Sequence, residues 1–125
     1  MSYVDGFLLV VPKKKLAAYK KMAALGAKIW MKYGALDYKE CIGDDMNPKG
    51  QEGMQMGPTF PKVANAKPDE VVVFSYIVFK SKAHRNQVNK KVMSHFDKKY
   101  ADHKDQAMPF DMARMAYCGF SVAVD

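Results

Sequence analysis

Two short stretches of the chain carry residue types that bind anions or transfer protons. His84 and Arg85 are adjacent near the start of a predicted helix, and a helix N-terminus itself favours an anion. Asp111 and Arg114 lie three residues apart in a short turn. The simpler interpretation is that Asp111 caps this turn and pairs with Arg114. Alternatively, Arg114 binds the anionic group of a ligand at the mouth of a pocket.

Aromatic side chains form the second group of candidates. Six of them could line a cavity between a sheet and its helices, and apolar concave sites commonly bind ligands. A hydrophobic core needs the same residues, and we favour the core interpretation. These aromatic residues are Trp30, Tyr33, Tyr38, Phe74, Tyr76 and Tyr117. The candidate ligand-binding residues are therefore Trp30, Tyr76, His84, Arg85, Asp111 and Arg114.

Two carboxylates fall inside predicted strands. If Asp5 or Glu40 pointed inward, burial would raise its pKa and make it a candidate acid or base. For Glu40 we expect an outward position at the edge of the sheet instead. The histidines have no metal-ligand spacing, because His84 and His95 lie about 16 Å apart along one helix at 1.5 Å per residue. We expect no metal and no cofactor, and no catalytic residue can be named.

The charge of the chain suggests one alternative function. The formal charge is +7, with 20 basic against 13 acidic residues, which could attract nucleic acid. Only Arg85 and Arg114 are arginines, and lysine suits solvation better than bidentate recognition. We therefore expect the lysine-rich helices to be solvated outer faces, and nucleic acid is an unlikely partner.

The chain has the composition of one globular domain of the cytoplasm. It has 125 residues and 49% hydrophobic residues, and no apolar run approaches the roughly 20 residues of a membrane span. The first apolar run, 7–11, is too short for a signal peptide. The two cysteines, Cys41 and Cys118, have no recognisable spacing. In a reducing compartment we expect both to be small buried hydrophobes.

Periodicity predicts six elements that position these residues. Eight of the nine residues at 71–79 are apolar or aromatic, which indicates a strand covered on both faces. A segment rich in proline and glycine, 45–69, is too irregular for a regular helix or a central strand. The predicted strands are 3–11, 35–44, 71–79 and 115–124, and the predicted helices are 13–33 and 82–99.

The order of these elements predicts an α+β fold. Strand, helix, strand, strand, helix, strand is the ferredoxin-like βαββαβ arrangement, an antiparallel four-stranded sheet with two helices on one face. One domain would span residues 1–125, with a long loop at 45–69. Ser75 and Tyr76 point to opposite faces of the strand. The face of the sheet without helices would therefore carry one or the other. Because that face is apolar, we expect a homodimer through it, a dimeric α+β barrel.

Several stretches of the chain resemble a known family. They are Tyr-Val-Asp-Gly-Phe at 3–7, Tyr-Lys-Glu-Cys at 38–41, Val-Phe-Ser-Tyr at 73–76, Ser-Lys-Ala-His-Arg at 81–85 and Pro-Phe-Asp-Met-Ala-Arg-Met at 109–115. Over nearly its whole length the chain resembles the bacterial domain of unknown function 1428 family, the YbaA-like proteins. The resemblance implies a dimeric α+β barrel. It carries over no catalytic residue, since the family has no established activity.

The sequence therefore leaves two functions to compare. The first is a homodimer that binds a small organic ligand, either as a binding module or as a cofactor-independent enzyme, by analogy with other proteins of this fold. The second is a nucleic-acid-binding module that uses the lysine-rich helices.

Overall fold

Strands and helices follow one another in the predicted order. The computed structural model describes residues 1–50, 53–54, 56–99 and 108–125. His103 and most of the polar segment 100–110 therefore lie outside the described residues. The elements are β1 (Tyr3–Pro12), a 3-10 turn (Lys13–Lys15), α1 (Leu16–Lys32), β2 (Asp37–Ile42), α2 (Phe60–Val63), β3 (Glu70–Phe79), α3 (Lys82–Lys99), a 3-10 turn (Met112–Arg114) and β4 (Ala116–Ser121).

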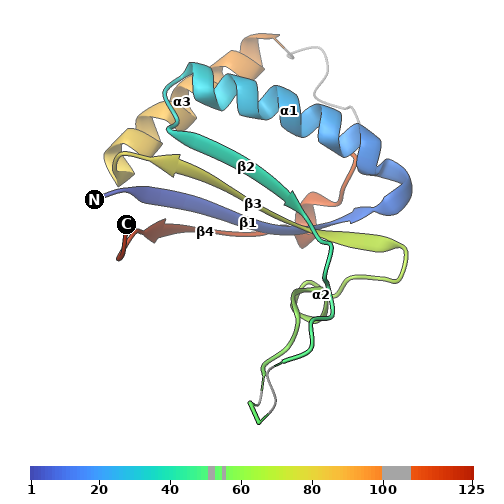
Figure 1. The fold of residues 1–125 in the computed structure, drawn as a ribbon. Helices are drawn as coiled ribbons and strands as arrows, with labels where there is room; N and C mark the ends of the chain where they lie inside the picture. The colour runs from blue at the N-terminus through green and yellow to red at the C-terminus, as the bar shows by residue number, and fades with distance from the viewer. Residues whose placement is uncertain (51–52, 55, 100–107) are drawn as a thin grey trace.

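The sheet is antiparallel throughout, with strand order β2-β3-β1-β4. The two most apolar strands, β1 and β3, are central, and Leu9 lies opposite Val73 in their pairing. The long helices α1 and α3 lie on the same side of the sheet (Figure 1). This arrangement confirms the predicted α+β, ferredoxin-like fold.

Local chemistry explains where the two long helices begin and end. The hydroxyl of Ser81 accepts a hydrogen bond of 3.1 Å from the backbone N–H of His84, so Ser81 caps α3. Gly34 has φ of +116°, a conformation that side-chain-bearing residues rarely adopt. It comes after Tyr33, the C-cap residue of α1, and turns the chain toward β2.

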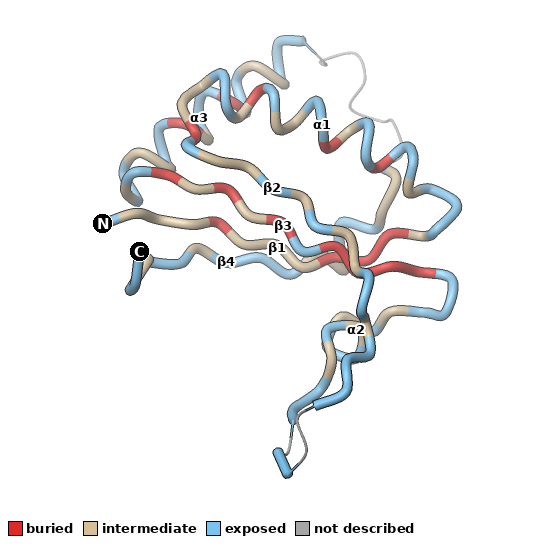
Figure 2. The backbone as a smooth tube through the Cα atoms, in the orientation of Figure 1, coloured by how far each residue is buried: buried red, intermediate tan, exposed pale blue. Residues whose placement is uncertain are grey.

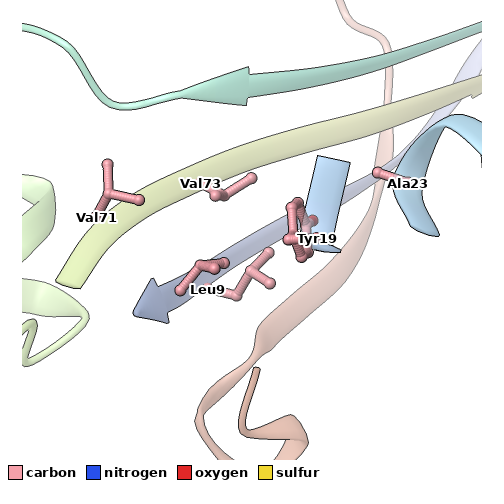
Figure 3. Close-up of a cluster of buried hydrophobic side chains, with 6 residues drawn as sticks. Leu9, Tyr19, Ala23, Val71 and Val73 are labelled. Atoms are coloured by element: carbon pink, nitrogen blue, oxygen red, sulfur yellow. The ribbon is translucent and has the colours of Figure 1, made fainter. Parts of the chain in front are cut away.

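The core lies between the helices and the odd-numbered residues of β1 and β3. Figure 2 shows the buried backbone concentrated along these two strands and on the inner side of the helices. One cluster joins Leu9, Val11, Val71 and Val73 to Tyr19 and Ala23 of α1 (Figure 3). A second cluster joins Ile77 and Phe79 to Ile29, Ala35, Val88 and Val92.

The long helices α1 and α3 leave the opposite face of the sheet uncovered (Figure 1). We call it the open face. Because side chains alternate along a strand, it carries the even-numbered residues of β1 and β3, including Tyr76, while Ser75 faces the helices. Phe74 and Phe120 are exposed there by 43% and 53%. The sequence left this choice of face open.

An arm projects from the sheet on the open side. We define it as the described residues between 43 and 69, which leave the sheet in the direction away from α1 and α3 (Figure 1). Although we expected this segment to be irregular, it contains the single helical turn α2. The ring of Phe60 in that turn meets the ring of Phe74 edge-on, with centroids 6.1 Å apart.

Two expectations about burial were wrong. Cys41 and Cys118 are exposed free thiols rather than buried residues, because both lie on edge strands and point to the open face. They lie on opposite edges of the sheet, Cys41 on β2 and Cys118 on β4. Phe74 and Tyr117 are also exposed rather than in the core, Phe74 on the open face and Tyr117 on the edge strand β4.

Candidate functional site

Glu40 points into the layer between sheet and helices. The outward position expected for it was wrong, because the face taken by an edge-strand residue depends on register, and α1 lies over the inner face of β2. The Tyr19 hydroxyl of α1 donates a hydrogen bond to Glu40 Oε1. The Tyr38 hydroxyl donates to Oε2 over 3.3 Å. Ser75, opposite Glu40 in the strand pairing, supplies a third hydroxyl.

The surroundings of this carboxylate control its protonation. Burial raises the pKa of Glu40 above its ordinary value, and the hydrogen bonds from the three hydroxyls only partly oppose that rise. Burial and the neighbouring carboxylate also raise the pKa of Tyr19 and of Tyr38, so both phenols keep their protons. Glu40 is therefore the group of this cluster that loses its proton first as the pH rises.

Aromatic side chains enclose the Glu40 cluster. The ring of Phe110 meets Tyr19 edge-on at 5.6 Å, and Trp30 lies 6.0 Å from the ring of Tyr38. At Gly26, one turn before Trp30, an added Cβ would lie 3.4 Å from the Tyr38 hydroxyl. The missing side chain thus lets α1 approach β2 closely.

A second polar network ties α3 to β1. The buried carboxylate of Asp5 lies 2.9 Å from Arg85 Nη1 and 3.5 Å from Asn89 Nδ2. Trp30 Nε1 donates to Asn89 Oδ1 over 3.0 Å. Two of the predicted candidates, Trp30 and Arg85, are therefore connected through Asn89 and Asp5. The Arg85 guanidinium also lies over the ring of Tyr3, 5.0 Å from its centroid.

The side chain of His84 makes its contacts with the residues just before α3. Its Nδ1 accepts a hydrogen bond of 3.0 Å from the backbone N–H of Lys80. Its ring meets Phe79 edge-on at 6.0 Å. Although His84 precedes Arg85 in the chain, these contacts give it no hydrogen-bonded carboxylate partner in the described structure.

Asp111 and Arg114 have separate partners. The Asp111 carboxylate accepts a hydrogen bond from the backbone N–H of Ala113 at 3.0 Å and so caps the 3-10 turn, as the simpler interpretation held. Arg114 instead binds both carboxylate oxygens of Glu70, at 2.6 and 2.9 Å. Its partner comes from a strand 44 residues away in the sequence, and no sequence pattern marked Glu70.

The six candidate residues thus fall in separate places. Trp30 and Arg85 share one network with His84 beside it, while Asp111 and Arg114 lie at the entry to β4. Tyr76 points to the open face, away from the others. Among the described residues, no cluster of three or more His, Cys, Asp or Glu side chains could hold a metal ion.

Fold and site together define a small ferredoxin-like α+β protein with a hydroxyl-bonded carboxylate inside its helical layer. The chain belongs to the family described as "Protein of unknown function (DUF1428)", whose model matches residues 2–112. It is 39% identical over 125 residues to "Uncharacterized protein YbaA" of Escherichia coli K12, covering 100% of this chain and 99% of that protein. The protein of the same name from Shigella flexneri matches with the same values.

These relatives are bacterial proteins whose names assign no activity. The expectation that the chain is a member of this family is confirmed. In the part of the chain that the structure describes, no helix has the length and apolar character needed to cross a membrane.

Proposed function

We propose that the protein binds a small organic molecule beside Glu40, which acts as a hydrogen-bonding anchor and as an acid or base without a cofactor. The observation that carries this proposal is the inward-facing Glu40 carboxylate, which Tyr19, Tyr38 and Ser75 surround with hydroxyls. A carboxyl group whose pKa is raised toward neutrality is suited to general acid–base catalysis. The aromatic rings around it suit an apolar or aromatic ligand.

We further propose that the protein works as a homodimer through its open face. Support comes from the exposed Phe74 and Phe120, since an apolar sheet face of this kind rarely remains in contact with water. A second copy would cover this face and complete a dimeric α+β barrel. The two free thiols, Cys41 and Cys118, fit a reducing compartment, and we place the protein in the cytoplasm on that ground.

The nucleic-acid alternative has weaker support. Lysines of α3 line a groove of about 740 Å³, together with Tyr33 and His95. The hydroxyl of Tyr33 is hydrogen-bonded to His95 Nδ1 at 2.9 Å and their rings meet edge-on, so Tyr33 is not presented as a stacking platform for a base. Binding of mixed RNA or DNA at 50 mM salt would favour this alternative.

The test of the ligand proposal is a fragment screen by protein-observed NMR. The wild type, Glu40→Gln and Asp37→Asn would be screened with the same set of small aromatic acids, phenols and amides. Asp37 is the matched control, because it lies on the same strand but on the opposite face, where it pairs with Lys39 at 2.6 Å. We expect fragments that perturb Tyr19 and Tyr38 to lose affinity in Glu40→Gln but not in Asp37→Asn. Equal affinity for all three proteins, or no fragment near Tyr38, would overturn the proposal.

A further inference from the structure

The exposed side of residues 13–32 carries only two kinds of side chain. This segment comprises the 3-10 turn before α1 and α1 itself. Each of its exposed residues is either a lysine or an apolar residue, and the segment contains no acidic residue. We call this surface the basic face. It consists of Lys13, Lys14, Lys15, Lys20, Lys21, Lys28 and Lys32, together with Ala17, Ala18, Ala24, Leu25 and Met31.

Solvation alone does not account for the basic face. A solvated helix surface usually mixes both signs of charge, because opposite charges four residues apart stabilise the helix. Here Lys28 and Lys32 have that spacing, and like charges four residues apart are unfavourable. Apolar side chains also remain exposed between the lysines, Leu25 by 38% and Met31 by 45%.

The charge at the start of α1 is unfavourable for the helix as well. Lys13, Lys14 and Lys15 precede α1, its first turn holds no acidic residue, and no side chain caps it by a hydrogen bond. A helix N-terminus carries a partial positive charge, so cations placed there oppose the helix dipole. An external anionic surface beside these lysines would offset that repulsion.

Helix α3 extends the positive charge over the same layer. It contains five lysines, and Asp97 is its one acidic residue. Both long helices lie on the side of the sheet away from the open face (Figure 1). A second copy of the chain on the open face would therefore leave the basic face accessible.

We propose that the basic face docks the protein on an anionic lipid surface. The lysine ammonium groups would lie among the lipid phosphates, and Leu25 and Met31 would enter the boundary between headgroups and acyl chains. Each lysine close to such a surface strengthens binding about fivefold. The opposite side of α1 holds Tyr19, Ala23 and Ile29 in the core, so the helix docks as part of the folded protein.

The side chains of the basic face favour lipid over other polyanions. Recognition of nucleic acid commonly relies on the planar fork of arginine and on aromatic rings that stack on bases. The basic face contains neither arginine nor an aromatic residue. In addition, a lipid boundary removes Leu25 and Met31 from water, which a phosphate backbone does not do.

Co-sedimentation of the full chain with lipid vesicles tests the proposal. Vesicles of phosphatidylcholine alone would be compared with vesicles containing about one-third phosphatidylglycerol, an anionic lipid, at low and at high salt. Lys21→Gln/Lys28→Gln removes two charges from the basic face. The matched control is Lys62→Gln/Lys67→Gln, which removes the same charge from exposed positions of the arm. Circular dichroism checks that each variant is folded.

We expect binding to the anionic vesicles only. It should be at least about tenfold weaker in Lys21→Gln/Lys28→Gln and unchanged in the arm variant. Leu25→Gln/Met31→Gln keeps the charge, so its remaining binding should disappear at high salt, whereas the wild type keeps part of its binding. Equal binding to both kinds of vesicle, equal losses in the two lysine variants, or wild-type binding by Leu25→Gln/Met31→Gln would overturn the proposal.

Mixed RNA tests for a different partner of the basic face. If RNA releases the protein from the vesicles and binds equally well to Leu25→Gln/Met31→Gln, the face binds polyanions in general and the proposal is wrong. Docking needs neither the Glu40 site nor the open face, so Glu40→Gln and Phe120→Glu should bind anionic vesicles as the wild type does. Loss of binding in either variant would place the lipid contact elsewhere and would also overturn the proposal.

Discussion

The guanidinium of Arg114 donates two hydrogen bonds to the carboxylate of Glu70, over 2.6 and 2.9 Å. The same guanidinium donates to the backbone carbonyl of Asn65 over 2.8 Å. Arg114 therefore joins three segments, the entry to β4, the start of β3 and the base of the arm. These hydrogen bonds all go to groups of the protein itself. They account for an arginine at this position without an anionic ligand.

Neutralising Glu70 should remove a pH-dependent part of the stability. The hydrogen bonds from Arg114 and from the backbone N–H of Lys67 lower the pKa of Glu70 from 4.5 to about 2. A lowered pKa stabilises the fold above pH 4.5, and this contribution is lost as the pH falls toward 2. Urea unfolding at pH 7, 4 and 3 should show a steeper loss for the wild type than for Glu70→Gln. If the free energy of unfolding fell equally with pH in the wild type and in Glu70→Gln, the lowered pKa of Glu70 would be contradicted.

Replacing Glu40 should have the opposite dependence on pH. Burial raises the pKa of Glu40 above 4.5, so the folded protein binds a proton more readily than the unfolded chain. Stability from this group is greatest at acidic pH and falls as the pH rises from 4.5 through the raised pKa. Relative to Glu40→Gln, the wild type should therefore become less stable over that window. NMR titration of the Glu40 side-chain carbon checks the shift directly, and a midpoint at or below 4.5 would rule it out.

Removing the partner of Asp5 should be strongly destabilising. The side chains of Asp5 and Arg85 are only 9% and 22% exposed. Breaking a buried ion pair from one side typically costs about 3–5 kcal/mol. We expect Arg85→Met to lower the free energy of unfolding by about 3 kcal/mol, because Asp5 is then left with Asn89 alone. The double variant Asp5→Asn/Arg85→Met should recover part of that loss, whereas additive losses would show that the pair is not coupled.

A charge on the open face should prevent self-association. In light scattering coupled to size exclusion, we expect the wild type at about twice the chain mass of 14.1 kDa. Phe120→Glu should elute as a monomer with unchanged far-ultraviolet circular dichroism, because its side chain is on that face. Val124→Glu is the control, since Val124 follows β4 and is 91% exposed. A monomeric wild type at micromolar concentration would exclude the proposed homodimer.

The sequence alone determined the order and type of the main elements. Residues 71–79 were continuous enough in apolar character to identify a central strand, and the helix predicted at 82–99 matches α3. Pro12 ends β1, Gly34 follows α1 and Ser81 caps α3, each through a local conformational or hydrogen-bonding preference. Such local preferences act within a few residues, so they can be recognised without the tertiary structure.

Contacts between distant residues were decided only by the tertiary structure. Glu40 became the centre of the candidate site because α1 brings Tyr19 to it from 21 residues away. Arg114 pairs with Glu70 rather than Asp111, and the parity of β3 directs Ser75 inward and Tyr76 outward. Side-chain alternation divides a strand into two faces, but only the packing of α1 and α3 selects which face is buried. The sequence thus specified the α+β frame, and packing assigned each polar side chain its partner.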